Sequence, residues 1–135
     1  MRWDISPVSP AHIKWLESVL YLVPTQKRHK DYKPFINKDT IGRSAKRLSD
    51  SSAMGWRAIK EMDTDRLATA MNECRMAHQI LIPNMFEINL SVPDAMGYKF
   101  VGAGGGGYLM AVSDKPVPNG IKFKIVQSEN YLERR

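Results

Sequence analysis

Residues 98–112 read YKFVGAGGGGYLMAV, and the expected architecture follows from this segment. Two short apolar stretches, 98–101 and 108–112, enclose six residues that have no side chain larger than a methyl group. A flexible linker would have polar flanks, whereas apolar flanks of this length are typical of buried strands. The sequence therefore predicts two strands joined by a glycine loop, residues 102–107, whose conformation is held by the fold.

The glycine loop has two explanations at the level of sequence. Glycine tolerates positive φ, and successive backbone N–H groups in such a loop can face an anion. Each glycine costs roughly 0.5–1 kcal/mol relative to alanine in a regular element, a cost that close approach to a ligand or to another backbone would explain. A tight turn between strands, or a packing contact, accounts for the same composition. Both explanations stay open here.

The flanks of the loop make its pattern more specific. Lys99-Phe100-Val101, the GAGGGG run and Tyr108-Leu109-Met110 together resemble the third signature motif of the GHMP small-molecule kinases, the family of galactokinase, homoserine kinase, mevalonate kinase and phosphomevalonate kinase. Within that family the segment looks most like the sugar and heptose-phosphate kinase branch. The resemblance is weaker over the rest of residues 16–126, where an apolar run, a basic loop and two helical stretches follow in the same order.

The resemblance implies the C-terminal domain of an ATP-dependent sugar or sugar-phosphate kinase. In that family an N-terminal domain binds the ATP phosphates through a Gly-Leu-Gly-Ser-Ser-Ala type loop and supplies an acidic magnesium ligand, and this sequence has no such segment. ATP and Mg²⁺ are then expected in the complete enzyme and not on this chain alone. The implied partners are an N-terminal kinase domain and a sugar or sugar-phosphate substrate, and the isolated chain is expected to be inactive.

By the same resemblance, the glycine loop would shape the phosphoryl-transfer site with its backbone N–H groups. The residues concerned are Gly102, Ala103, Gly104, Gly105, Gly106 and Gly107. Lys99 on the entering strand and Arg28 in the basic loop are candidate anion contacts, although alternation along the strand could equally turn Lys99 toward solvent. No catalytic residue is assigned.

The sequence predicts no metal site. His12, His29 and His78 lie in different expected elements, with no close histidine or cysteine partner at ligand spacing. His78 is expected on the inner face of a helix as a hydrogen-bonded core residue.

The net charge of +6 is concentrated in residues 27–47, a segment that contains eight lysines and arginines but only two aspartates. A local positive field indicates an anionic partner. Solvated surface lysines, a phosphorylated small molecule and nucleic acid are the competing explanations. Nucleic acid is disfavoured, because Tyr32 and Phe35 are the segment's only aromatic residues for base stacking.

The chain has 135 residues and one cysteine, Cys74, so it can form no internal disulfide. Its apolar runs are far shorter than the ~20 residues of a membrane helix, and no membrane association is expected. The first residues lack the apolar stretch of a secretion signal. The expected compartment is therefore the cytoplasm.

The hydrophobic periodicity and the positions of turn and capping residues predict an α+β fold: a ferredoxin-like antiparallel sheet of about four strands with helices packed on one face. The expected strands are 16–23, 98–101, 108–112 and 121–125, and a short helical turn is expected over 11–17. One helix should run from Asp39 or Thr40 to about Met62, with an apolar stripe at Ile41, Ala45, Leu48, Ser52, Trp56 and Ile59. A second, capped by Asp63 or Thr64, should end at Pro83 and bury Leu67, Ala70, Met71, Cys74, His78 and Leu81.

The expected organisation is a lead-in over 1–15, which would be the edge of an N-terminal domain, a kinase-like domain over 16–126 and a tail over 127–135. Two other functions remain open. One is a stand-alone small-ligand-binding or dimerisation module that kept this fold. The other is a nucleic-acid-binding α+β domain that uses the basic segment.

Overall fold

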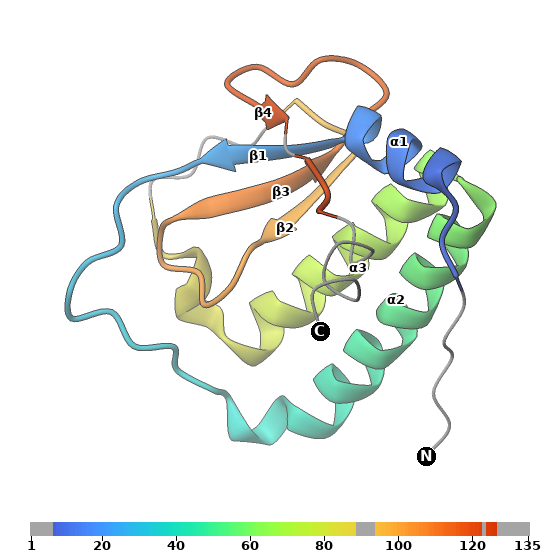
Figure 1. Cartoon of the computed structure of the whole chain (residues 1–135). Helices are drawn as coiled ribbons and strands as arrows, with labels where there is room; N and C mark the ends of the chain where they lie inside the picture. Colours follow the sequence, from blue (N-terminus) through green and yellow to red (C-terminus); the bar gives the residue numbers. More distant parts are fainter. Residues whose placement is uncertain (1–6, 89–93, 123, 127–135) are drawn as a thin grey trace, which may run out of the picture.

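The computed structural model describes residues 7–88, 94–122 and 124–126, and it has a four-stranded antiparallel sheet with helices on one face (Figure 1). The strand order is β2-β3-β1-β4. In chain order the elements are α1 (Pro10–Val19), β1 (Leu20–Pro24), η1 (Lys38–Thr40), α2 (Ile41–Glu61), α3 (Thr64–Leu81), η2 (Pro83–Phe86), β2 (Gly97–Phe100), β3 (Tyr108–Val112) and β4 (Ile121–Lys122). The α+β class and the antiparallel sheet are as the sequence predicts.

The two faces of the sheet bury two clusters of apolar side chains. Leu20 pairs with Val112 across β1 and β3, and both pack toward α2 and α3. Because side chains alternate along a strand, the neighbouring pair Tyr21 and Ala111 points to the other face. There Phe100 and Leu109 join a second cluster, closed by side chains from η2 and from the loop that precedes β4.

The strand expected over residues 16–23 begins later than predicted, because its first part is helical. Ser9 caps α1 by accepting a hydrogen bond from the N–H of His12 at 3.3 Å, and Pro10 occupies the first turn. Leu16 and Val19 belong to the end of this helix and pack in the helix-side cluster. The polar residues Glu17 and Ser18 interrupt the apolar run, and the Ser18 hydroxyl donates to the carbonyl of Trp15 at 2.6 Å within the helix, so only the residues after them continue as a strand. Helix α1 also spans the expected domain limit at residues 15/16.

The face that α2 buries also differs from the predicted apolar stripe. Its buried residues are Ser44, Ser51 and Ala58, at a spacing of seven, whereas Ala45 and Ser52 of the predicted stripe are exposed. Small side chains let the backbones of α2 and α3 approach each other. At this contact the size of a residue on α2 therefore matters more than its hydropathy. The stripe prediction is therefore wrong in part.

Helix α3 lies directly on the sheet and confirms the predicted cap. The side chain of Asp63 accepts a hydrogen bond from the N–H of Arg66 at 3.0 Å. Of the predicted inner residues, Leu67, Ala70 and Met71 are buried, and Cys74, His78 and Leu81 are half-buried. At Gly97 a Cβ would lie 2.5 Å from the carbonyl oxygen of Ala68, so only glycine permits this contact between β2 and α3.

Side chains of α3 also cover the outer edge of β2. The Asn72 amide donates to the carbonyl of Met96 at 3.1 Å and accepts from the N–H of Tyr98 at 3.2 Å. The guanidinium of Arg75 donates to the carbonyl of Tyr98 at 3.3 Å and lies 4.0 Å from its ring centroid. An edge strand with satisfied backbone groups presents little template for pairing with another chain.

Replacing Asn72 with alanine should therefore lower the free energy of unfolding by about 1–3 kcal/mol, because two backbone groups lose their partner. Urea denaturation measures the change. Gln79→Ala, on the exposed face of the same helix, serves as the matched control and should be nearly neutral. Equal effects of the two substitutions would contradict the edge-covering role of Asn72.

The last predicted strand is shorter than expected. Among the described residues, only Ile121 and Lys122 pair with β1, opposite Leu22 and Tyr21. Phe123, the expected tail 127–135 and the start of the lead-in (1–6) lie outside the described residues. Among the helices that the structure describes, none has the length and hydropathy needed to cross a bilayer.

Candidate functional site at the glycine loop

The glycine loop joins β2 to β3 and takes a conformation that glycine favours at five of its six positions. Gly102, Gly104, Gly105, Gly106 and Gly107 all have positive φ, between 69° and 137°. Side chains larger than hydrogen are strained in this region of backbone space.

Neighbouring groups occupy the space where side chains would project from the middle of the loop. A Cβ on Gly104 would overlap the Met85 side chain, and one on Gly105 would lie 2.5 Å from the ring of Tyr32. At Gly106 the neighbours are backbone, with the carbonyl oxygen of Gln26 at 2.7 Å from the added Cβ. The loop is therefore packed against the protein on several sides, which is the close approach that its composition indicates.

The basic loop, residues 25–37 between β1 and η1, lies against the glycine loop and is bonded to it. The N–H and the hydroxyl of Thr25 both donate to the carbonyl of Gly107, at 2.8 and 2.7 Å. The N–H of Gly107 in turn donates to the carbonyl of Gln26 at 2.9 Å. These three bonds extend the pairing of β1 with β3 beyond the ends of the strands.

Arg28 and Tyr32 hold the loop from the same side. The Nε of Arg28 donates to the carbonyl of Gly104 at 2.8 Å, and the hydroxyl of Tyr32 donates to that of Ala103 at 2.7 Å. The guanidinium lies 6.0 Å from the centre of the Tyr32 ring. Burial raises the pKa of Tyr32 above its usual value, with the positive charge of Arg28 opposing the shift. The phenol accordingly stays protonated and able to donate at neutral pH.

The backbone N–H groups expected to face an anion divide into two sets. Those of Gly105 and Gly107 donate to protein carbonyls, of Met85 and Gln26 respectively, each at 2.9 Å. Those of Gly102, Ala103, Gly104 and Gly106 have no acceptor among the described residues. Gly104 and Gly106 are buried, whereas Gly102 and Ala103 lie at the exposed start of the loop. Any anion held by backbone donors would therefore meet the 102–103 end.

The structure separates the two candidate cationic contacts. It brings Arg28 to the glycine loop, where its Nε is used internally. Lys99 instead faces the helices, and its Nζ donates to the carbonyl of Phe100 at 3.0 Å. It borders a pocket of about 170 Å³ that Met71 and Cys74 of α3 also line. Burial, with the positive charge of Lys99, lowers the pKa of His78 on the same helix.

Four residues that contact the glycine loop were not assigned to it from the sequence: Thr25, Gln26, Tyr32 and Met85. Tyr32 has a signal, since it is an aromatic residue four positions after a candidate arginine in a basic loop. Met85 has no such signal in the sequence, because it follows the expected end of the second helix at Pro83. Its side chain and its carbonyl contact the glycine loop only through the tertiary fold. Within the described ranges, no three histidine, cysteine or acidic side chains are grouped for metal binding.

Replacing Arg28 with alanine should lower the free energy of unfolding by about 1–3 kcal/mol, because the buried carbonyl of Gly104 loses its donor. Amide hydrogen exchange should rise in residues 102–107. Arg43→Ala is the matched control, since the Arg43 side chain has no bonded partner among the described residues, and its effect should stay within about 0.5 kcal/mol. An unchanged exchange rate in Arg28→Ala would show that Arg28 does not hold the loop.

Comparison with known proteins finds one sugar kinase. The chain is 31% identical, over 131 aligned residues, to the bifunctional fucokinase/GDP-fucose pyrophosphorylase of Arabidopsis thaliana. The match covers 84% of this chain and 12% of the plant protein. No family model matches the sequence, and no solved structure matches it. The similarity supports a kinase-related region and reaches no further than that part of the relative.

Proposed function

We propose that this chain is the C-terminal domain of a GHMP-type sugar or sugar-phosphate kinase and supplies the glycine wall of its phosphoryl-transfer site. The observation that carries the proposal is the glycine loop, which is packed and held in one conformation between two strands and has free N–H groups at its 102–103 end. Preorganised backbone donors suit phosphoryl transfer, where catalysis is mostly positioning and charge stabilisation.

The similarity to the plant protein supports the same proposal. That relative has two activities by name, and the match alone does not choose between them. The GHMP-like glycine motif of this chain points to the kinase activity. In this proposal ATP and Mg²⁺ belong to an N-terminal kinase domain, on the same or a separate chain, and this chain contributes the loop and part of the sugar pocket.

A hybrid protein tests the proposal. The matched region of the plant relative is replaced by this chain; the kinase activity is assayed with L-fucose and MgATP, and the pyrophosphorylase activity is assayed separately with added fucose 1-phosphate and GTP. Retained pyrophosphorylase activity shows that the hybrid is produced, and thermal melting like that of the plant protein shows that the replaced region is folded. We then expect sugar-dependent ATP consumption, lost in the Gly106→Val hybrid. A folded hybrid without kinase activity would overturn the assignment, and efficient MgATP-dependent turnover by the isolated chain would overturn the half-enzyme role.

A stand-alone ligand-binding module is the second candidate. It is favoured by the internal bonds of the glycine loop, which is complete without a partner domain: Gly105 and Gly107 donate to the protein's own carbonyls. This candidate predicts that a sugar phosphate raises the melting temperature of the isolated chain in the absence of ATP. A melting temperature indifferent to such ligands would count against it.

A further inference from the structure

The fold leaves most of the positive charge of residues 27–47 without a partner. Lys46 pairs with Asp50, Arg47 pairs with Glu73, and Arg28 is bonded to the glycine loop. The remaining basic side chains of this fully described segment have no ion pair or hydrogen bond within the part of the chain that the structure describes: Lys27, Lys30, Lys33, Lys38 and Arg43. Folding therefore does not account for this charge.

Large apolar side chains are exposed in the same region. Phe35 is 68% exposed, and Ile36, Ile41 and Ile80 are 40–48% exposed. They lie on two segments that hydrogen bonds hold together, since the N–H of Asn37 donates to the carbonyl of Leu81 at 2.7 Å. Apolar patches rimmed by polar residues mark interaction sites more often than scattered single residues do. We call these four side chains, with Lys33, Lys38 and Arg43, the apolar-basic face.

Hydrogen bonds to a side chain of η2 hold the backbone at Phe35 and just before it. The Asn84 side chain of η2 accepts from the N–H of Phe35 at 2.8 Å and donates to the carbonyl of Lys33 at 2.7 Å. Met85, the next residue, contacts the glycine loop. The apolar-basic face is thus presented by an ordered backbone and adjoins the glycine loop through η2.

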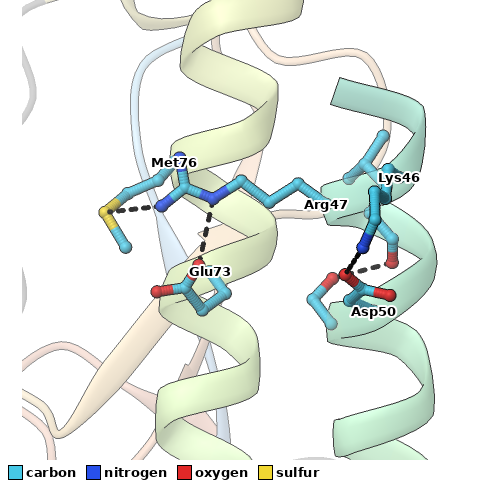
Figure 2. A network of polar contacts seen from close by, with 7 residues as sticks. Lys46, Arg47, Asp50, Glu73 and Met76 are labelled. Carbon is cyan, nitrogen blue, oxygen red and sulfur yellow. Dashed lines mark hydrogen bonds and ion pairs between the residues drawn. The ribbon is translucent and has the colours of Figure 1, made fainter. Parts of the chain in front are cut away.

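A pocket of about 250 Å³ lies beside the face, between the start of α2 and the end of α3, lined by Arg43, Ser44, Arg47 and Ile80. Figure 2 shows the Arg47 side chain crossing to α3, where its Nε donates to the Glu73 carboxylate at 3.0 Å and its Nη2 contacts the Met76 sulfur at 3.7 Å. Arg43 has no such partner among the described residues.

Ser44, like Arg43, is a polar residue at this pocket whose side chain lacks a hydrogen-bond partner among the described residues. The residue is 2% exposed, and its hydroxyl is buried. A buried hydroxyl without an acceptor is costly. Helix α2 also begins here without a side-chain cap and without an acidic residue in its first turn. A carboxylate in the pocket would meet the Arg43 guanidinium near the positive end of the helix.

We propose that the apolar-basic face docks an acidic protein surface, in which apolar side chains cover Phe35, Ile36 and Ile80 and a neighbouring carboxylate enters the pocket beside Arg43. Charge complementarity selects this occupant. A second copy of the chain would bring like charges together. A membrane would cover the exposed apolar side chains and present anionic headgroups, so vesicle binding is measured as the alternative outcome. The proposal is independent of the kinase assignment.

A random-peptide display library, selected against the whole chain, tests the proposal. We expect selected peptides to carry aspartate or glutamate next to leucine, isoleucine or phenylalanine, and to bind more weakly as salt rises. By fluorescence anisotropy, Ile36→Ser and Arg43→Glu should each weaken a selected peptide by about tenfold or more, as buried anchors of an interface do. Val8→Ser and Lys14→Glu, exposed apolar and basic positions beside and within α1, are the matched controls and should bind normally.

Thermal melting of each variant shows that it is folded. The proposal is overturned if the selected peptides lack acidic residues, or if the control substitutions weaken binding as much as Ile36→Ser and Arg43→Glu. It is also overturned if the face is occupied by something else. Sedimentation of the chain as a dimer that Ile36→Ser dissociates would assign the face to a second copy. Binding to phosphatidylserine vesicles that Arg43→Glu abolishes, without peptide binding, would assign it to a membrane.

Discussion

Gly106→Ala is expected to lower the free energy of unfolding by roughly 2–5 kcal/mol. The positive φ contributes about 1–2 kcal/mol of this loss, and overpacking around the added methyl group contributes about 1–3 kcal/mol. Gly106 has φ 137°, and an added Cβ would lie 2.7 Å from the carbonyl oxygen of Gln26 and 2.8 Å from the backbone of Arg28. A flexible side chain could turn away, but backbone held by neighbouring hydrogen bonds cannot do so cheaply. Urea denaturation measures the loss.

Two other glycines separate the causes of this effect. Gly102 has φ 91° but open space around its Cβ position, so Gly102→Ala should carry only the conformational cost of about 1–2 kcal/mol. Gly42 lies within α2 with nothing near its Cβ position, and Gly42→Ala should stabilise the chain by about 0.5–1 kcal/mol. If Gly106→Ala costs no more than Gly102→Ala, the basic loop does not pack on the glycine loop in solution.

Phe100→Ala should cost about 3–5 kcal/mol, the range for removing a buried aromatic side chain. Phe100 ends β2 directly before the glycine loop and is 2% exposed. Its ring packs edge-on against Phe86 of η2, with centroids 5.1 Å apart. Its loss would remove one of the contacts that hold η2 beside the glycine loop, next to the hydrogen bond from the N–H of Gly105 to the carbonyl of Met85. Hydrogen exchange should therefore rise in residues 83–88 and 102–107, alongside the lower midpoint of urea unfolding.

Phe35→Ala is the matched control for this substitution, because the same ring is removed from a site that is 68% exposed. Its effect on stability should stay within about 0.5 kcal/mol. Comparable losses from the two phenylalanines would mean that the face of the sheet opposite the helices is not a packed core.

Several elements were predictable because their signals are local. The glycine loop between two apolar segments, the Asp63 cap and the antiparallel sheet are all confirmed. The beginning of β1 was missed although the sequence holds a local signal, because Glu17 and Ser18 interrupt the apolar run predicted as a strand and only residues 19–23 are continuously apolar. The buried face of α2 was also missed, since Ser44 and Ser51 are polar residues chosen for their size against α3.

The candidate site was partly predictable for a related reason. A run of small residues is visible along the chain, but the groups that occupy the space beside it are distant in sequence. Arg28 and Lys99 looked alike as candidates, since each is a cation near an expected loop or strand. Register decides between them: Lys99 pairs with Met110 and faces the helices, whereas Arg28 follows β1 past its pairing with β3 and reaches Gly104.

Residue order alone was enough to establish that residues 102–107 form a constrained loop between strands and that the positive charge is gathered in 27–47, because glycine content, alternation and charge are properties of neighbouring residues. Tertiary structure decided which residues meet the loop, that Tyr32 and Met85 are among them, and that the segments carrying the exposed side chains of Phe35, Ile36 and Ile80 are bonded to each other. Those relations depend on the packing of α3 against the sheet and on the path of the basic loop. They join residues from 20 positions apart, for Met85 and Gly105, to 82 positions apart, for Thr25 and Gly107, a range over which no local propensity acts.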